Sequence, residues 1–319
     1  MGRTRVLIGG ANYARAYLRA ARQAPDAYEV VGVLARGSDR ARRTADELGV
    51  PMVTDPGALP MQVDMACTAL GREGSTAILE LLDQGIHVLC EHPQPVDIVR
   101  QALEVGTSSG ARFHVNGHFA DLEATRTFVG CWHTVRQTAE LRFLQVVLAD
   151  RFLYAVVDIL KRAFGRLEPV TVEHGGKSGP FTLLQCSFGG DVAATWCVQR
   201  SESPDGTLLP EGSPEYLVAY RIVAGFDSGL ISLLSVGGPV VWNSNEPRVG
   251  DPDLALWHPI HTPMVTGRAL IEERSGVNLG AMNALVEHAE GGDTPATQTR
   301  EYLEEVSRTW ETLGRGLIP

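Results

Sequence analysis

The strongest constraint on the fold is the regular alternation of short apolar runs and amphipathic segments through the first 116 residues. Strands separated by helices can pair in parallel, and the connecting helices then cover both faces of the sheet. The sequence therefore predicts an α/β fold that begins with a Rossmann-type, doubly wound parallel sheet. The expected strands are residues 5–8, 29–34, 63–69, 87–89 and 112–115, and the expected helices are residues 15–22, 40–48, 76–84 and 96–108.

The pattern changes near residue 120. Two helical segments are followed by strands of period two with glycine turns between them, which predicts a C-terminal α+β domain with a largely antiparallel open sheet. We expect a first domain of residues 1–119 and a second domain of residues 120–319, with a C-terminal helix at 297–313 that could pack back on the first domain. The expected helices are 122–132 and 152–164, and the expected strands are 170–174, 182–188, 191–199, 229–236 and 240–242.

Composition excludes several classes of protein. The formal net charge of −10 argues against a partner that is a nucleic acid or an anionic membrane. The sequence contains no run of about 18 apolar residues, so it predicts no membrane span. Its five scattered cysteines form no CxxC pair and fit reduced thiols in the cytoplasm. His258 and His261 have an HxxH spacing, but no cysteine or carboxylate ligand lies nearby in the sequence and Pro259 breaks a helix, so we expect no metal.

A glycine turn follows the first expected strand and precedes the first expected helix, which is the context of a dinucleotide-binding fingerprint. Gly9, Ala11 and Ala14 occupy the three G-x-G-x-x-G positions, so the match is degenerate. Ala14 is tolerated for helix–strand packing, whereas Ala11 adds a methyl group where the backbone approaches a pyrophosphate. An ordinary strand–helix turn is the alternative. The candidate cofactor-binding residues here are Gly9, Gly10, Ala11, Asn12, Tyr13 and Ala14.

The end of the second expected strand bears on which dinucleotide would bind. An NAD-binding unit places an acidic residue there for the ribose 2′-hydroxyl, but this chain has Ala35, followed by Arg36, Ser38 and Arg40. Guanidinium groups without a competing carboxylate suit a 2′-phosphate. The sequence therefore predicts NADPH as cofactor, and the alternative is a solvated charged turn that opens the next helix.

Three polar residues fall at the carboxyl ends of later strands, namely Thr68, Glu91 and Asn116. Ligands of doubly wound sheets bind beyond these ends, so the segment CEHPQP at residues 90–95 is expected on the rim of the cofactor site. Thr68, Glu91 and Asn116 complete our list of candidate cofactor-binding residues.

The order of these features resembles the Gfo/Idh/MocA oxidoreductases. Most of that family carries E-K-P after this strand, whereas this chain has Glu91-His92-Pro93, and histidine in place of the lysine resembles the thiazolinyl imine reductase subfamily of siderophore biosynthesis. EHP is more specific in combination with R-x-x-Y-x-x-x-D and G-P-V-x-W further along the chain. The similar segments are residues 5–14, 31–38, 85–93, 115–116, 151–160, 199–200 and 238–244.

The resemblance implies an NADPH-dependent reductase that converts a thiazoline C=N bond to a thiazolidine on a nonribosomal peptide intermediate. It also implies a peptidyl carrier protein domain as the partner that carries the substrate, and a homodimer. Reduction of C=N needs a proton on nitrogen, and histidine is the side chain that titrates near neutral pH. His92 is therefore the first candidate for the proton donor, with positioning of the nicotinamide or simple packing as alternatives.

The relatives also place a tyrosine shortly after the fifth strand, and that position here is Phe119, which cannot donate a proton. Three explanations stay open: the tyrosine is dispensable, His118 takes part, or a bound water does the work. His118 is therefore the second candidate catalytic residue.

An aryl-thiazoline requires an apolar slot with a few polar anchors. Our candidate substrate residues are Phe119, Arg151, Tyr154, Asp158 and Trp242. Docking of an acidic carrier protein would require a basic patch, for which Arg126, Arg136, Arg142, Arg151, Lys161 and Arg162 are available.

Two other functions remain as alternatives. The first is an NADP-dependent sugar or inositol dehydrogenase, although alignment on the D-x-G-x-H-x-x-D helix of such enzymes places Arg151 at the first Asp and Ala155 at the His. The helix then lacks a general base for the oxidation of a hydroxyl group. The second is a sensor that binds NADP without turnover.

Overall fold

The computed structural model describes residues 2–10, 14–71, 74–201, 216–244, 257–262 and 265–317. The chain forms two compact units. Unit 1 consists of Met1–His118 and Ile271–Ser307, and unit 2 consists of Phe119–Leu270 and Arg308–Pro319. The sequence places a single division after residue 119, whereas the structure returns residues 271–307 to the first unit. Within the described ranges, no helix is long and apolar enough to cross a membrane.

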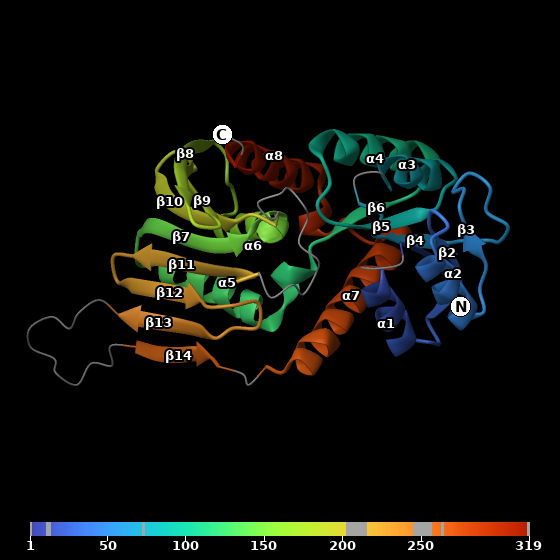
Figure 1. The fold of residues 1–319 in the computed structure, drawn as a ribbon, viewed down its shortest axis with the longest axis horizontal. Helices are drawn as coiled ribbons and strands as arrows, with labels where there is room; N and C mark the ends of the chain where they lie inside the picture. The colour runs from blue at the N-terminus through green and yellow to red at the C-terminus, as the bar shows by residue number, and fades with distance from the viewer. Residues whose placement is uncertain are drawn as a thin grey trace, which may run out of the picture. The chain divides into compact units, whose positions relative to one another are not determined.

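Unit 1 contains a six-stranded sheet whose strands are all parallel, in the order β3-β2-β1-β4-β5-β6 (Figure 1). This is the strand order of a dinucleotide-binding fold, with its topological switch point between β1 and β4. The predicted Rossmann-type sheet is confirmed. The strands are β1 (Thr4–Gly9), β2 (Tyr28–Leu34), β3 (Met52–Val53), β4 (Met65–Thr68), β5 (His87–Glu91) and β6 (Phe113–Asn116).

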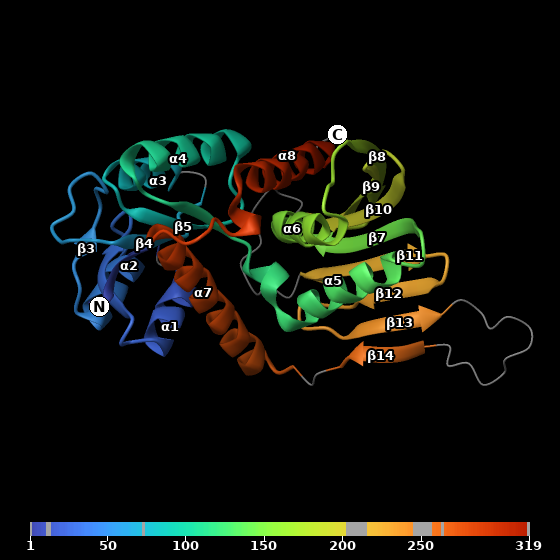
Figure 2. The same ribbon diagram turned by 180° about the vertical axis from the view of Figure 1, so that it is seen from behind.

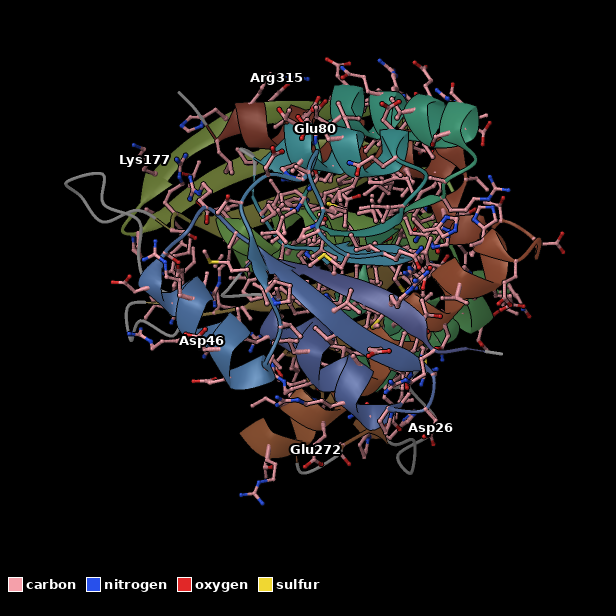
Figure 3. The ribbon with its side chains drawn as sticks, turned by 90° about the vertical axis from the view of Figure 1, so that its right-hand side faces the viewer. Asp26, Asp46, Glu80, Lys177, Glu272 and Arg315 are labelled. Carbon is pink, nitrogen blue, oxygen red and sulfur yellow. The ribbon has the colours of Figure 1, made fainter. Side chains whose placement is uncertain are left out.

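The helices between these strands follow the sequence pattern within a few residues. They are α1 (Arg15–Gln23), α2 (Asp39–Leu48), α3 (Ser75–Asp83) and α4 (Val96–Ser109). The hydroxyl of Ser38 accepts a hydrogen bond from the Ala41 amide and caps α2, and Gly49 ends the helix at φ 66°. Asp46 on α2 and Glu80 on α3 are exposed and point outward (Figure 3).

Helix α7 (Gly267–Ala289) is absent from the sequence prediction. Met282 and Leu285 of this helix are fully buried in the core that β1 and α1 form. Tyr28 donates a hydrogen bond of 2.6 Å to Asn283 Oδ1 of the same helix. Glycines and charged residues interrupt the apolar stripe of α7, so its period is weak, and its contacts within unit 1 define its buried face.

Unit 2 contains an eight-stranded sheet in the order β14-β13-β12-β11-β7-β10-β9-β8. Only the β7–β10 pair is parallel among its described pairs, so the predicted, largely antiparallel sheet is confirmed. The central strands β7 and β11 were not predicted. The strands are β7 (Leu141–Ala149), β8 (Val170–Ser178), β9 (Phe181–Phe188), β10 (Val192–Gln199), β11 (Tyr220–Phe226), β12 (Gly229–Leu233), β13 (Val240–Ser244) and β14 (Trp257–His261).

Helices α5 (Glu123–Arg136) and α6 (Leu153–Phe164) lie on one face of this sheet (Figures 1 and 2). Leu144, Val146 and Leu148 of β7 alternate along the strand and are buried, as period two requires for one covered face. On the other face, Phe143 keeps 42% of its surface exposed. The last helix, α8 (Arg300–Gly316), belongs to unit 1 as far as Ser307 and to unit 2 from Arg308.

Candidate active site

The candidate site lies at the carboxyl ends of neighbouring parallel strands in unit 1. Thr68 at the end of β4 pairs in register with Cys90 of β5, and Glu91 at the end of β5 pairs with Asn116 of β6. The sheet therefore brings together the three strand-end residues that the sequence selects.

Glu91 is fixed from one side by a buried polar network. Its Oε2 accepts a hydrogen bond of 2.6 Å from the Tyr17 hydroxyl and a longer one of 3.5 Å from Asn116 Nδ2. Asn116 Nδ2 also lies 2.8 Å from the Tyr17 oxygen and 2.7 Å from Asn278 Oδ1. Tyr17 and Asn278 contact the candidate site, and the sequence analysis did not select them. Tyr17 sits among the apolar positions of α1, and Asn278 belongs to the unpredicted α7.

Two imidazoles face the other oxygen of Glu91. His92 Nδ1 and His118 Nδ1 each lie 3.3 Å from Glu91 Oε1. Burial opposes ionisation of this carboxyl group, but His118, His92 and the Tyr17 hydroxyl together outweigh it and lower the pKa of Glu91 to about 2. Glu91 is therefore a carboxylate at neutral pH and supplies the negative charge of the site.

The tautomer of His92 follows from its backbone contact. His92 Nδ1 lies 2.7 Å from the carbonyl oxygen of Asn116. A carbonyl oxygen can only accept, so Nδ1 carries the hydrogen. Gain and loss of a proton then take place at Nε2.

Gly9 and Gly10 let the chain pack closely on the end of β4. Gly10 has φ 103°, and a Cβ atom there would lie 2.6 Å from the carbonyl oxygen of Ala69. A Cβ atom on Gly9 would lie 3.1 Å from Thr68 Cγ2. Only glycine suits position 10, and the chain is thereby kept close to β4. The predicted residues Ala11, Asn12 and Tyr13 lie outside the described residues, and Ala14 is fully buried at the start of α1.

The buried polar atoms near the rim that have no hydrogen-bond partner among the described residues include two amide oxygens, Asn116 Oδ1 and Gln94 Oε1. Gln94 is anchored through its Nε2, which donates to the Glu91 carbonyl oxygen at 3.0 Å. Buried acceptors of this kind need a donor. The carboxamide of a nicotinamide has the chemistry to supply one, so these residues fit a bound NAD(P).

The turn after β2 exposes the predicted Arg36, Ser38 and Arg40. Ser38 is committed to capping α2, and Ala35 leaves the strand end without a carboxylate. Asp39, the next acidic residue in the sequence, forms an ion pair with Arg42 at 2.8 Å.

The ligand atoms of Glu91, His92 and His118 lie within 4.8 Å of one another, which in the described part of the chain makes them the one group close enough to share a cation. Of the HxxH histidines, His258 is exposed and His261 Nε2 lies 3.6 Å from Glu123 Oε1.

Three of the predicted substrate residues are part of the interior of unit 2. Phe119 is 8% exposed and packs edge-on against Phe152 and Tyr220, with ring centroids 5.3 and 6.3 Å away. Tyr154 is buried with its ring 6.1 Å from that of Trp310. Asp158 is buried 3.4 Å from Arg162.

The other two are accessible. The guanidinium of Arg151 lies 4.1 Å from the ring centroid of Tyr216 and 4.8 Å from that of Phe152, so two aromatic rings hold an exposed cation. Trp242 lines a small pocket of about 270 Å³. Its other lining residues are Cys131, Thr134, Val135, Ile231, His258 and Ile260.

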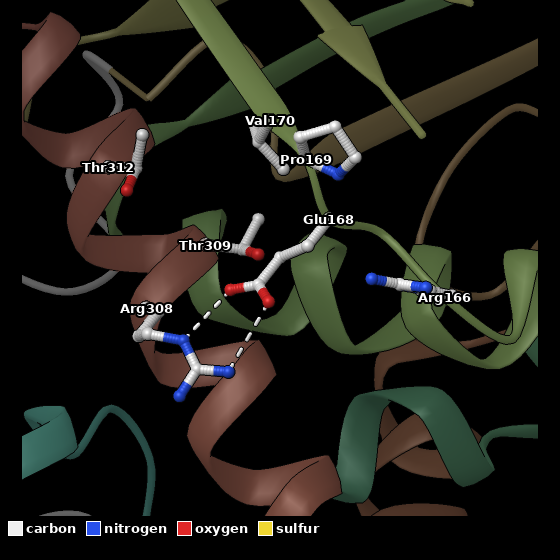
Figure 4. A pocket seen from close by; sticks show the side chains of 7 residues that line it. All are labelled: Arg166, Glu168, Pro169, Val170, Arg308, Thr309 and Thr312. Atoms are coloured by element: carbon white, nitrogen blue, oxygen red, sulfur yellow. Dashed lines mark hydrogen bonds and ion pairs between the residues drawn. The ribbon is translucent and has the colours of Figure 1, made fainter. Parts of the chain in front are cut away.

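A larger pocket of about 380 Å³ lies elsewhere in unit 2, and none of the predicted site residues lines it (Figure 4). Arg308 contacts Glu168 across its wall at 2.8 and 3.4 Å, so the charges at its centre compensate each other. Its remaining lining residues are Arg166, Pro169, Val170, Thr309 and Thr312.

Comparison with known structures supports the fold over the whole chain. GenD2 from gentamicin A biosynthesis, in complex with NAD, matches with a TM-score of 0.70 at 15% identity, over 99% of this chain and 95% of that chain. The WlbA dehydrogenase from Bordetella pertussis, in complex with NADH and UDP-GlcNAcA, gives 0.73 at 12% identity, over 99% and 96%. Biliverdin reductase from Synechocystis, in complex with biliverdin and NADP+, gives 0.70 at 13% identity, over 98% of both chains.

By sequence, no curated protein matches the chain. A family model does match residues 4–117, and its description is an oxidoreductase family with an NAD-binding Rossmann fold, GFO_IDH_MocA. That span contains the glycine turn, the end of β2 and the Glu91-His92-Asn116 rim. Residues 4–117 are therefore similar to the NAD(P)-binding Rossmann fold of the Gfo/Idh/MocA oxidoreductases, and the match covers this part of the chain alone.

Proposed function

We propose that this protein is an NADPH-dependent reductase that converts a thiazoline C=N bond to a thiazolidine on a carrier-tethered nonribosomal peptide intermediate. The observation that carries the proposal is the environment of His92. Its Nδ1 is committed to the Asn116 carbonyl oxygen and its charge is balanced by Glu91, so Nε2 is the atom that can deliver a proton.

The reaction needs two donations. When bound, reduced nicotinamide supplies the hydride with its electron pair to the imine carbon. His92 Nε2 gives a proton to the imine nitrogen as the π bond breaks, and the imidazole is left neutral. Asn116 and Gln94 offer acceptors to the nicotinamide carboxamide, and the glycine turn after β1 is where a pyrophosphate binds in folds of this kind.

NADPH is preferred in this proposal because of the turn after β2. Ala35 removes the carboxylate that would accept the ribose 2′-hydroxyl, and the exposed Arg36 and Arg40 can bind a 2′-phosphate. The complex of biliverdin reductase with NADP+ gives an instance of this phosphorylated cofactor on a similar fold.

A sugar dehydrogenase is the second candidate, because the similar WlbA dehydrogenase carries UDP-GlcNAcA. Oxidation of a hydroxyl group needs a general base near it. Here Ala155 occupies the expected histidine position and is 2% exposed, while Asp158 forms an ion pair with Arg162. This arrangement favours the imine reductase.

The proposed partner is an acidic peptidyl carrier protein domain. Several of the cations available for docking are already engaged: Arg142 contacts Glu140 and Asp227, and Arg162 contacts Asp121. Arg151 is exposed and remains as a contact for an acidic surface or a phosphate. We place the reaction in the cytoplasm, in keeping with five cysteines that form no disulfide.

We also propose that the enzyme is a homodimer that uses the uncovered face of the unit 2 sheet. Phe143 of β7 lies opposite Gly225 of β11, and a Cβ atom on Gly225 would lie 2.1 Å from the Phe143 ring. The glycine therefore lets the exposed ring lie flat on the sheet, where a second copy can cover it.

The test is incubation of a hydroxyphenyl-thiazoline pantetheine thioester with the protein and NADPH, followed by mass spectrometry. We expect a gain of two hydrogens, a much slower reaction with NADH, and a loss of about 100-fold or more for His92→Gln. His133→Gln is the matched control, since His133 is exposed on α5. Oxidation of a UDP-sugar with NADP+ would favour the second candidate instead, and tight NADPH binding without turnover of either substrate would favour a sensor.

A further inference from the structure

The pocket of about 380 Å³ in unit 2 is separate from the residues proposed for the reaction, since none of them lines it. Its volume lies within the range of about 300–1,000 Å³ that small-molecule sites occupy. Side chains of α8 form one wall, and the chain that follows α6, from Arg166 to Val170, forms the other (Figure 4). All lining residues belong to unit 2, so a ligand here would contact a single compact unit.

Several polar groups of the lining are already engaged by the protein. Glu168 and Arg308 form an ion pair with contacts of 2.8 and 3.4 Å. The hydroxyl oxygen of Thr312 accepts a hydrogen bond of 3.0 Å from Arg315 Nη2. These three lining side chains therefore have protein partners before any ligand enters.

Arg166 brings to the pocket a cation that no other residue in the described part of the chain pairs with. It is exposed, and neither a hydrogen bond nor an ion pair joins its side chain to another described residue. Figure 4 shows its guanidinium pointing toward the side of the pocket where Glu168 lies. The lining contains two arginines and one glutamate, which is a surplus of one positive charge in a chain of formal net charge −10. A ligand with one negative charge would compensate it.

The hydroxyl of Thr309 is a second lining group without a partner. The residue is 1% exposed, and its Oγ1 has no hydrogen-bond partner among the described residues. Figure 4 shows this oxygen on the side of α8 that is turned toward Glu168. A buried hydroxyl that stays unpaired costs stability, and a ligand oxygen that enters the pocket would supply the missing partner.

We propose that this pocket binds a small carboxylic acid with a short apolar body. The fork of the Arg166 guanidinium matches the two oxygens of a carboxylate, and the Thr309 hydroxyl can donate to one of them. Pro169 and Val170 give apolar contact to the rest of the ligand (Figure 4). A phosphate monoester fits less well, because it carries about 1.5–2 negative charges at neutral pH and would lie close to the Glu168 carboxylate.

The test is calorimetric titration of the whole protein with benzoate, without substrate or cofactor. Benzamide has the same ring without the charge, and phenyl phosphate carries the other anion. We expect one benzoate per chain, bound more tightly than phenyl phosphate and about 10-fold more tightly than benzamide. Arg166→Gln should weaken benzoate binding by about 10-fold. Arg221→Gln is the matched control, since Arg221 is an exposed arginine of β11 that does not line the pocket.

Thr309→Val tests the hydroxyl separately and serves if Arg166→Gln does not fold. Valine keeps the branched shape and removes the oxygen, so the ligand-free protein should keep or raise its Tm while benzoate binds several-fold more weakly. Native benzoate binding in both variants would overturn the site, as would no benzoate binding or equal affinity for benzamide. Tighter binding of phenyl phosphate would overturn the assignment to a carboxylate. None of these measurements uses imine reduction, so the site and the proposed function can fail independently.

Discussion

The hydroxyl of Tyr17 donates a 2.6 Å hydrogen bond to Glu91 Oε2, from a residue 74 positions earlier in the chain. Tyr17 is fully buried, and burial together with the Glu91 charge raises its pKa well above the ordinary value. The phenol therefore stays protonated and acts only to hold the carboxylate in place.

Replacement of Tyr17 by Phe should lower the stability of the protein and change the ionisation of Glu91. The variant loses a buried hydrogen bond to a charged acceptor, so we expect a loss of about 1–3 kcal/mol in the free energy of unfolding. It should also raise the pKa of Glu91, because the Tyr17 hydroxyl is one of the groups that lower it. Urea unfolding and carbonyl NMR of Glu91 measure the two effects. Tyr302→Phe is the control, and equal losses in both variants would speak against a special role for Tyr17.

Ala35→Asp should change the preference for the cofactor. The new carboxylate would lie where an NAD-binding unit accepts the ribose 2′-hydroxyl, and it would repel a 2′-phosphate. We expect the dissociation constant for NADPH to rise by about 10-fold or more while that for NADH falls, as measured by calorimetry. An unchanged ratio would mean that this turn does not contact the ribose.

Asn278→Leu should weaken cofactor binding at the rim, because Asn278 contacts Asn116 although the two are far apart in the sequence. The variant removes Asn278 Oδ1, the acceptor 2.7 Å from Asn116 Nδ2. That donor then keeps only its contacts with the Tyr17 oxygen and with Glu91 Oε2 among those described above. We expect weaker binding of the dinucleotide by about 10-fold and a fall in stability of about 1–3 kcal/mol. Fluorescence titration of NADPH and urea unfolding measure these effects. Native binding in this variant would show that Asn116 does not depend on α7.

Stability should fall in acid because of His114. Burial, then the nearby His288, His87 and Arg112, lower the pKa of His114 to about 3. The unfolded chain takes up this proton near pH 6.5 and the folded chain does not, so stability is complete above pH 6.5 and is lost as the pH falls towards 3. We expect a contribution of about 3 kcal/mol to the loss between pH 6.5 and 4.

The comparison that isolates this effect is urea unfolding of His114→Leu against the native protein across that pH range. The variant should show the flatter dependence on pH, although it also loses the 2.9 Å contact with His288 Nδ1. Parallel curves for the two proteins would contradict the assignment. His133→Gln should follow the native curve.

Phe143→Lys should dissociate the proposed dimer. The side chain is 42% exposed, so a lysine can extend into solvent without disturbing the buried face of β7. Light scattering coupled to size exclusion should report a monomer with a native thermal transition. A variant that stays dimeric would show that the second copy binds elsewhere.

The sequence predicts the parallel sheet of unit 1 well because each of its strands is a compact apolar run closed by a helix. Prediction was weaker in unit 2. The core strand β7 reads LRFLQVVLA, in which Phe143 and Val147 on the uncovered face blur the alternation. Helix α7 has no clear apolar stripe because glycines and charged residues interrupt it.

The candidate site was only partly predictable. Glu91, His92, His118 and Asn116 follow from strand ends and from the family resemblance. The roles of Tyr17 and Asn278 depend on which residues a helix turns toward the strand ends, and periodicity does not specify that. Periodicity also does not show that α6 is buried on nearly all sides. Tyr154 and Asp158 were therefore predicted as substrate contacts although both are buried.

The return of α7 to unit 1 has a consequence for how the protein is made. Asn278 follows its partner Asn116 by 162 residues. At translation rates of about 5–20 residues per second, a ribosome needs roughly 10–30 s to cover that interval. Throughout it, the nascent Rossmann sheet has already emerged but lacks the helix that buries Met282 and Leu285 against it. The whole of the intervening sheet is synthesised in that time, so chaperone engagement of the nascent chain should be strongest in this window.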